Sequence, residues 1–207
     1  MINIIEFFGN ESATQYKKIS LIHKKSINDG FLASLNLSIL IQLYRVFAKS
    51  SHASLFIASD KKNNILGFIV LSFSTSKLYR EFILKRFFIV LPLILPRIFS
   101  IKFIRKVIET LLYPFKKELT IDSEAEVLNF CVDKAHRGKG LGDKLFLKAE
   151  DSLRSRGIRS LKIVTGIDQI VAQKFYEKRG AILLGNQEIH KGSTSLIYQY
   201  NIITNTL

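Results

Sequence analysis

The chain has 207 residues, of which 47% are hydrophobic, which is enough for one sizeable core but short for two independent domains. Its single cysteine, Cys131, excludes an internal disulfide framework, and no pair of Cys or His residues falls at metal-ligand spacing. Lys and Arg outnumber Asp and Glu by 31 to 17, and the net charge of +14 favours anionic partners. We therefore expect one domain over residues 1–207, without a metal site.

The N-terminal segment and the apolar runs bear on localisation. The first residues lack a basic region and a small-residue cleavage site, so they do not resemble a signal peptide. The longest run free of both charged and polar residues, residues 87–96, has about ten residues, whereas a membrane-spanning helix needs about twenty. We expect a cytoplasmic protein without a transmembrane helix.

The first half of the chain predicts a strand, two helices and a hairpin. Apolar residues recur at helical spacing over residues 20–26 and 32–47. Two runs rich in strand-forming residues, 53–59 and 65–73, flank a segment whose Asp and Asn residues suit a turn between antiparallel strands.

The pattern changes between the third and fourth expected strands. Aromatic and aliphatic residues alternate with basic ones, and all three prolines of the chain, Pro92, Pro96 and Pro114, lie here. We expect a helical insertion over residues 76–120 made of two or three short helices. Pro92 and Pro96 are expected to break or begin helices, because proline inside a helix removes a hydrogen bond.

The second half predicts alternating strands and helices: strands over residues 126–132 and 161–164, helices over 141–156 and 171–179, and strands over 181–187 and 194–200. The complete order predicts an α/β (α+β) fold with a mixed, mostly antiparallel central sheet of about seven strands flanked by helices.

A glycine-rich segment joins the strand at 126–132 to the helix that follows. Gly138, Gly140 and Gly142 permit close approach of the backbone to a ligand, and a helix N-terminus attracts phosphate. Arg137 and Lys139 add positive charge. The segment therefore predicts a phosphate site, although a glycine pattern of this kind has low specificity alone.

Three spaced motifs resemble the GCN5-related N-acetyltransferase (GNAT) superfamily. Residues 137–142 match its [Q/R]-x-x-G-x-[G/A] loop after a strand. Residues 126–133 match the preceding strand, and residues 172–180 match the A-x-x-F-Y-x-x-x-G signature. The resemblance implies the acyl-CoA N-acyltransferase fold and acetyl-CoA as the acetyl-donor cosubstrate.

The resemblance also implies which residues bind acetyl-CoA. The pantetheine arm would pair with the strand backbone, the pyrophosphate would bind at the glycine-rich loop, and a further contact would come from the helix of the third motif. The residues implied are Phe130, Cys131, Val132, Arg137, Gly138, Lys139, Gly140, Leu141, Gly142, Gln169 and Tyr176. Gln169 stands where the family often has Asn, so its contact with pantetheine departs from the pattern.

Two residues are candidates for proton transfer. Tyr176 matches the tyrosine of the family that protonates the departing thiolate, whereas a core aromatic residue is the structural alternative. Glu126 is the candidate base that removes a proton from the amine. Glu124 and a chain of water molecules are alternatives, and either carboxylate could instead be a solvated strand-end residue.

The acceptor is not defined by the sequence. The basic, aromatic insertion resembles that of acetyltransferases associated with cell-envelope sugar assembly, which implies an amino sugar on a nucleotide or lipid carrier. Positive charge would suit the diphosphate of such an acceptor, while peptide N-termini and small-molecule amines stay open. The alternative class is a non-catalytic acyl-CoA-binding module. Nucleic acid is not expected as a partner, because no helix-turn-helix, zinc or RNP pattern is present. The insertion at 76–120 could pack on the sheet, cap the acceptor pocket, form a homodimer or contact an anionic membrane.

Overall fold

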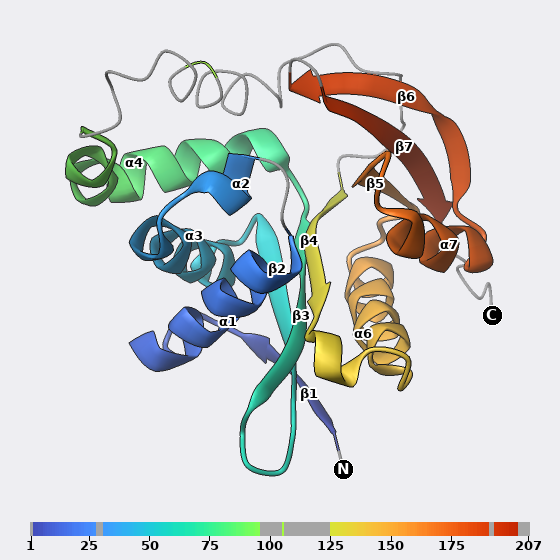
Figure 1. Cartoon of the computed structure of the whole chain (residues 1–207), viewed down its shortest axis with the longest axis horizontal. Helices are drawn as coiled ribbons and strands as arrows, with labels where there is room; N and C mark the ends of the chain where they lie inside the picture. The colour runs from blue at the N-terminus through green and yellow to red at the C-terminus, as the bar shows by residue number, and fades with distance from the viewer. Residues whose placement is uncertain (1, 28–30, 96–104, 106–124, 191–192, 203–207) are drawn as a thin grey trace.

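The computed structural model describes residues 2–27, 31–95, 105, 125–190 and 193–202 (Figure 1). Within this part of the chain, seven strands form one sheet in the order β1-β2-β3-β4-β5-β7-β6. The strands are β1 (Asn3–Phe7), β2 (Ala53–Ser59), β3 (Ile65–Ser72), β4 (Glu126–Val132), β5 (Ser160–Gly166), β6 (Ile182–His190) and β7 (Ser193–Asn201). Neighbouring strands are antiparallel except β4 and β5, which are parallel. The expected mixed, mostly antiparallel sheet is confirmed.

Helices cover both faces of the sheet (Figure 1). They are α1 (Ala13–Ser26), α2 (Phe31–Ser34), α3 (Leu37–Lys49), α4 (Thr75–Ile94), α6 (Leu141–Ser155) and α7 (Ile170–Lys178), with a short 3-10 helix, η3 (Lys134–His136). Side chains of α1, α3 and α4 form one buried cluster with the sheet. Side chains of α6 and α7 form a second cluster on the other face. Strands β2 and β3 are buried along their whole length because both faces are covered.

Two helix boundaries differ from the sequence prediction. α1 begins at Ala13 rather than near residue 20, because Ser12 and Gln15 form a capping box, with each side chain bonded to the other's backbone N–H. The helix expected over residues 32–47 is divided into α2 and α3. Asn36 lies at the division, and its side chain accepts a hydrogen bond from the Ile39 backbone N–H at 2.8 Å.

The prediction that Pro92 would break or begin a helix was wrong. α4 is a continuous helix of 20 residues with Pro92 inside it. The missing N–H costs the helix a hydrogen bond, but Val90 is buried and Leu93 and Ile94 pack against the first cluster, which keeps this end of the helix in place. Pro96, Pro114 and most of the expected insertion from residue 96 onward lie outside the described residues.

Candidate active site

Strands β4 and β5 part in the middle of the sheet. They are paired only at Glu126↔Lys162 and Val127↔Ile163. Beyond Val127, the register of β4 against β3 shifts by one residue, which is a β-bulge. Residues 130–132 continue to pair with β3 but have no register partner in β5. The parting leaves the β5-facing edge of this half-strand available for a ligand.

The glycine-rich loop follows this half-strand directly. Gly138 and Gly140 have φ angles of +72° and +71°, a left-handed conformation that glycine adopts without strain. Arg137 Nε donates to the Val132 carbonyl at 3.0 Å, and Lys139 Nζ donates to the Ala135 carbonyl at 3.0 Å. Gly140 is the N-cap of α6, so the loop ends at a helix N-terminus, where backbone N–H groups and the helix dipole favour an anion.

An aromatic cluster joins the strand, the loop and α7. The Phe130 ring centroid lies 5.4 Å from that of Phe175 and 6.4 Å from that of Tyr176. A Cβ added at Gly142 would lie 3.5 Å from both Phe130 Cζ and the Phe175 ring. Arg179 stacks 4.8 Å from the Phe146 and Phe175 ring centroids and forms an ion pair with the Asp143 carboxylate. The structure therefore brings all three sequence motifs to one place.

Burial controls the ionisation of two side chains in this region. Tyr176 is 4% exposed, and burial raises its pKa above the ordinary value, with a smaller contribution from nearby Cys131. Burial also raises the pKa of Cys131 to about 12, although Arg137 acts in the opposite direction. Tyr176 therefore keeps its proton at neutral pH, as a proton donor must, and Cys131 is a neutral thiol.

Glu126 lies at the other end of β4, against the start of α4. Its carboxylate accepts a hydrogen bond from Thr75 Oγ1 at 3.2 Å, and Thr75 Oγ1 lies 3.2 Å from Ser72 Oγ. Burial raises the pKa of Tyr79, and the negative charge of Glu126 raises it further. Glu126 is 8% exposed. A buried carboxylate held by a hydroxyl chain has a fixed orientation, which suits a proton acceptor.

Lys162 is the residue opposite Glu126 across the parallel pair of strands. Burial lowers the pKa of Lys162 to about 8, because the charged ammonium loses solvation. The sequence analysis identified neither Lys162 nor Thr75. A lysine within the otherwise apolar run at 161–164 was the available signal for Lys162, and Thr75 could be found only from the tertiary contact.

Glu126 lies apart from the cluster in which Tyr176 contacts Phe130. Phe130 is four positions after Glu126 in β4, a distance of about 13 Å along the strand. Proton removal by Glu126 would therefore pass through water or depend on an acceptor that reaches toward α4. The alternative base, Glu124, lies outside the described residues.

Gln169 lies in the turn between β5 and α7. It is exposed, and its backbone N–H donates to the Gly166 carbonyl at 3.0 Å. Its Cγ lies 3.5 Å from the position that a Cβ of Gly166 would occupy. Nearby, the buried Gln173 donates from Nε2 to the carbonyls of Gly166 and Ile167 at 3.0 and 2.8 Å. The side-chain amide of Gln173 thus holds the turn at the end of β5.

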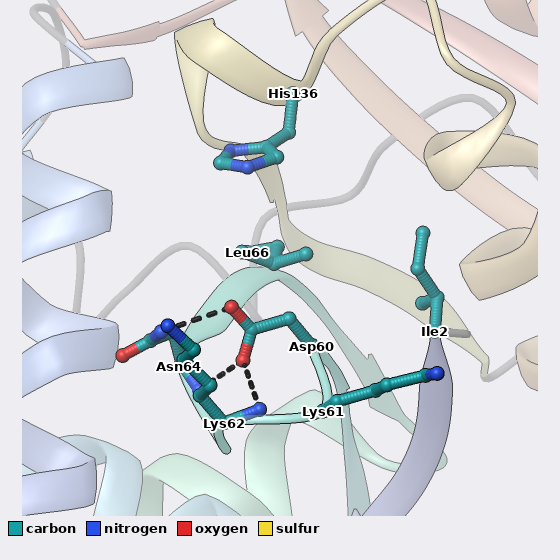
Figure 2. Close-up of a pocket in the computed structure, with 7 residues that line it drawn as sticks. All are labelled: Ile2, Asp60, Lys61, Lys62, Asn64, Leu66 and His136. Carbon is teal, nitrogen blue, oxygen red and sulfur yellow. Dashed lines mark hydrogen bonds between the residues drawn. The ribbon is translucent and has the colours of Figure 1, made fainter.

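A shallow hollow lies on the far side of the glycine-rich loop (Figure 2). It is lined by Ile2, Asp60, Lys61, Lys62, Asn64, Leu66 and His136. The Asp60 carboxylate accepts hydrogen bonds from the Asn64 side chain and from the Lys62 and Asn64 backbone N–H groups at 2.8 to 2.9 Å, which orders the β2–β3 turn. None of the predicted site residues lines this hollow, so the parted strands are the better candidate site.

The described residues offer neither a candidate metal-binding group nor a candidate membrane-spanning helix. Among the residues described, no group of three or more His, Cys, Asp or Glu side chains could hold a metal ion. In the same part, the helices are too short or too polar to cross a membrane.

The part of the chain that carries the three motifs is similar to a known family. A model of the acetyltransferase (GNAT) family matches residues 98–181, which include β4, the glycine-rich loop, α6 and α7. The match covers less than half of the chain but contains all three motifs, in agreement with the resemblance seen in the sequence.

One curated relative and several solved structures are similar to this chain. The uncharacterized protein YxbD of Bacillus subtilis (strain 168) is 43% identical over 49 residues, a match that spans 24% of this chain and 31% of that protein. The ribosomal-protein-S18-alanine N-acetyltransferase of Escherichia coli has a TM-score of 0.59 at 13% identity, covering 100% of this chain and 99% of its own. Ard1 of Thermoplasma volcanium has a TM-score of 0.61 at 16% identity, covering 98% and 99%.

A Bacillus anthracis protein solved in complex with acetyl coenzyme A has a TM-score of 0.50 at 18% identity, covering 76% of this chain and 67% of its own. At these identities the structural similarity establishes the fold. It agrees with the seven-stranded sheet and its flanking helices.

Proposed function

We propose that this protein is an acetyl-CoA-dependent N-acetyltransferase of the GNAT family that transfers the acetyl group to a primary amine by direct attack in a ternary complex. The observation that supports this most is the parting of β4 and β5 immediately before a loop of left-handed glycines and a helix N-terminus. An elongated ligand with a thioester at one end and a pyrophosphate at the other fits this succession of a free strand edge and an anion site.

The half-strand and the loop have separate roles in this proposal. The backbone of Phe130, Cys131 and Val132 pairs with the amide groups of the pantetheine arm, as an added strand would. The loop binds the pyrophosphate through Arg137, Gly138, Lys139, Gly140, Leu141 and Gly142. Strand N–H groups near the thioester stabilise the oxyanion that forms when the amine attacks.

Two side chains transfer protons on opposite sides of the reacting carbon. Glu126 accepts a proton from the ammonium form of the acceptor through water, because only the neutral amine can attack. The amine nitrogen bonds to the thioester carbon, the carbon–sulfur bond breaks, and Tyr176 donates its proton to the departing thiolate. The attacking nitrogen then releases its second proton to solvent, and Tyr176 regains a proton from solvent. Tyr176 is suited to this role because its raised pKa keeps it protonated. Gln169, at the start of α7, supplies a further contact to the pantetheine.

We propose an amino sugar on a nucleotide or lipid carrier as the acceptor, with the reaction in the cytoplasm, where acetyl-CoA is available. A protein with a net charge of +14 attracts a diphosphate-bearing acceptor and repels a polyamine. A peptide N-terminus is a competing acceptor, in keeping with the structural neighbour named as a ribosomal-protein-S18-alanine N-acetyltransferase. Small-molecule amines are a further alternative.

The competing function class is a non-catalytic acyl-CoA-binding module. A thermal-shift measurement with acetyl-CoA, followed by a thiol-release assay over a panel of amines, separates the two classes. Stabilisation together with thiol release that depends on an amine supports the transferase. Stabilisation without release on any amine supports the binding module, and absence of stabilisation contradicts both.

A further inference from the structure

The outward side of α4 carries an apolar and basic stripe. Its members recur every three or four residues, so they lie on one side of the helix: Lys77, Arg80, Leu84, Phe87, Phe88, Leu91 and Leu95. All seven are exposed. Phe88 is 84% exposed, the highest value among the large hydrophobic residues that are described, and Leu84 is 70% exposed. A large apolar strip of this kind on a folded protein marks an interaction surface.

The opposite side of α4 already has its partners. Leu78 and Val90 are buried, and Phe82 and Leu93 pack against the cluster formed with α1 and α3. Figure 1 shows α4 lying beside α3 on the same face of the sheet. The helix is therefore apolar on two sides, and packing within the described part of the chain explains only the inner one.

The charge distribution of α4 distinguishes between a lipid surface and a second copy of the chain. Lys77 and Arg80 lie at the N-terminal end of the stripe, which contains no acidic residue. The one acidic residue of α4, Glu81, has the same spacing but is half-buried, and its carboxylate accepts hydrogen bonds from Lys85 and Ser50. A symmetric contact would place each stripe against its own copy, so the two cations would meet no opposite charge.

We propose that α4 docks this protein on the surface of an anionic lipid bilayer. The apolar side chains from Leu84 to Leu95 enter the interfacial region, and Lys77 and Arg80 bind lipid phosphates. The helix lies in the plane of the membrane, consistent with its being unable to span it.

The N-terminal end of α4, which would lie at the bilayer, begins beside the proposed base. Thr75, two residues before Lys77, holds the Glu126 carboxylate. An acceptor carried on a lipid would then meet the protein where the proposed base is located. This consequence rests on the proposed function, whereas the docking itself does not.

Vesicle sedimentation at low salt tests the docking without measuring activity. The full chain should sediment with vesicles of phosphatidylcholine and phosphatidylglycerol in equal parts, and much less with phosphatidylcholine alone. The double variant Phe87→Ser/Phe88→Ser should bind about tenfold more weakly or worse, because two exposed aromatic side chains no longer enter the interface. Lys77→Gln/Arg80→Gln should lose the preference for anionic vesicles.

The matched control is Phe8→Ser/Leu147→Ser, which removes two apolar side chains that are 68% and 51% exposed on other elements. It should bind as the unmodified protein does. Circular dichroism melts establish that each variant is folded. The proposal is overturned if the unmodified protein stays in the supernatant, if the control loses as much binding as the α4 variant, or if light scattering shows a dimer that Phe87→Ser/Phe88→Ser dissociates while vesicle binding is absent.

Discussion

Replacing Gly140 with alanine separates the backbone strain of the glycine-rich loop from its proposed role in binding. Gly140 has φ +71°, and a Cβ added there would have no heavy atom within 4 Å. The substitution therefore introduces no clash within the folded chain. It imposes only the cost of a left-handed conformation on a residue with a side chain, about 1 to 2 kcal/mol. If the loop keeps its shape, the free energy of unfolding falls by this amount.

Binding of acetyl-CoA should fall as well. The new Cβ enters the open space that faces the proposed pyrophosphate site, and relaxing the strain would turn the N–H groups at the start of α6 away from it. A loss of about 1.4 kcal/mol corresponds to a tenfold weaker affinity. Isothermal titration calorimetry with acetyl-CoA measures the affinity, and urea unfolding measures the stability.

Gly157 supplies the matched control. It also has φ +71° and no heavy atom within 4 Å of an added Cβ, but it follows the C-terminal end of α6. Gly157→Ala should lose the same stability and keep its affinity for acetyl-CoA. If Gly140→Ala binds acetyl-CoA as the unmodified protein does, or if both variants weaken binding equally, the loop is not the phosphate site.

Three further predictions concern side chains. Tyr176→Phe should lower kcat about a hundredfold or more while acetyl-CoA still raises the melting temperature, and unchanged turnover would exclude Tyr176 as the acid. Thr75→Val should move the acid limb of the pH profile of kcat/KM to higher pH, because the Glu126 carboxylate loses a hydrogen-bond donor that favours its charged form. Thr75→Ser should restore the profile of the unmodified protein. Coinciding profiles for the unmodified protein and both variants would argue against Glu126 as the base. Burial, with a smaller effect from Lys24, lowers the pKa of His23 from 6.5 to about 4. The unfolded chain therefore binds the proton more readily than the folded chain does. About 3 kcal/mol of stability should be lost as the pH falls from 6.5 to 4. Urea unfolding across this range measures the loss, and the same slope in His23→Gln would contradict it.

The strands and the spaced motifs could be predicted from the sequence because their signals are local. β4 has the bounds predicted from its apolar run, and α6 begins at the predicted Leu141 after the glycine-rich loop. Positive φ angles at Gly138 and Gly140 agree with the reason for placing a phosphate site there. Tyr176 and Phe130 meet because α7 packs over the half-strand at residues 130–132.

The rest of the site depends on contacts between segments far apart in the chain. Thr75 and Glu126 are 51 residues apart, and their hydrogen bond follows from the position of α4 on the sheet. The opposition of Lys162 and Glu126 follows from the register of two parallel strands. The β-bulge in β4 is likewise a property of pairing, since the residues at 126–132 form a uniform strand pattern. The continuity of α4 through Pro92 could not be predicted from the low helix propensity of proline, because it depends on the packing of Val90 in the core.

A strand that binds its ligand through the main chain can tolerate many different side chains. Residues 130–132 keep one edge unpaired inside the sheet, and an unpaired edge would invite another chain to add a strand and aggregate. The edge lies between two strands that still meet at Glu126 and Lys162, which leaves it accessible to a slender ligand but not to a second sheet. Such a site can persist while most of the sequence changes, in keeping with whole-chain structural matches at 11 to 16% identity.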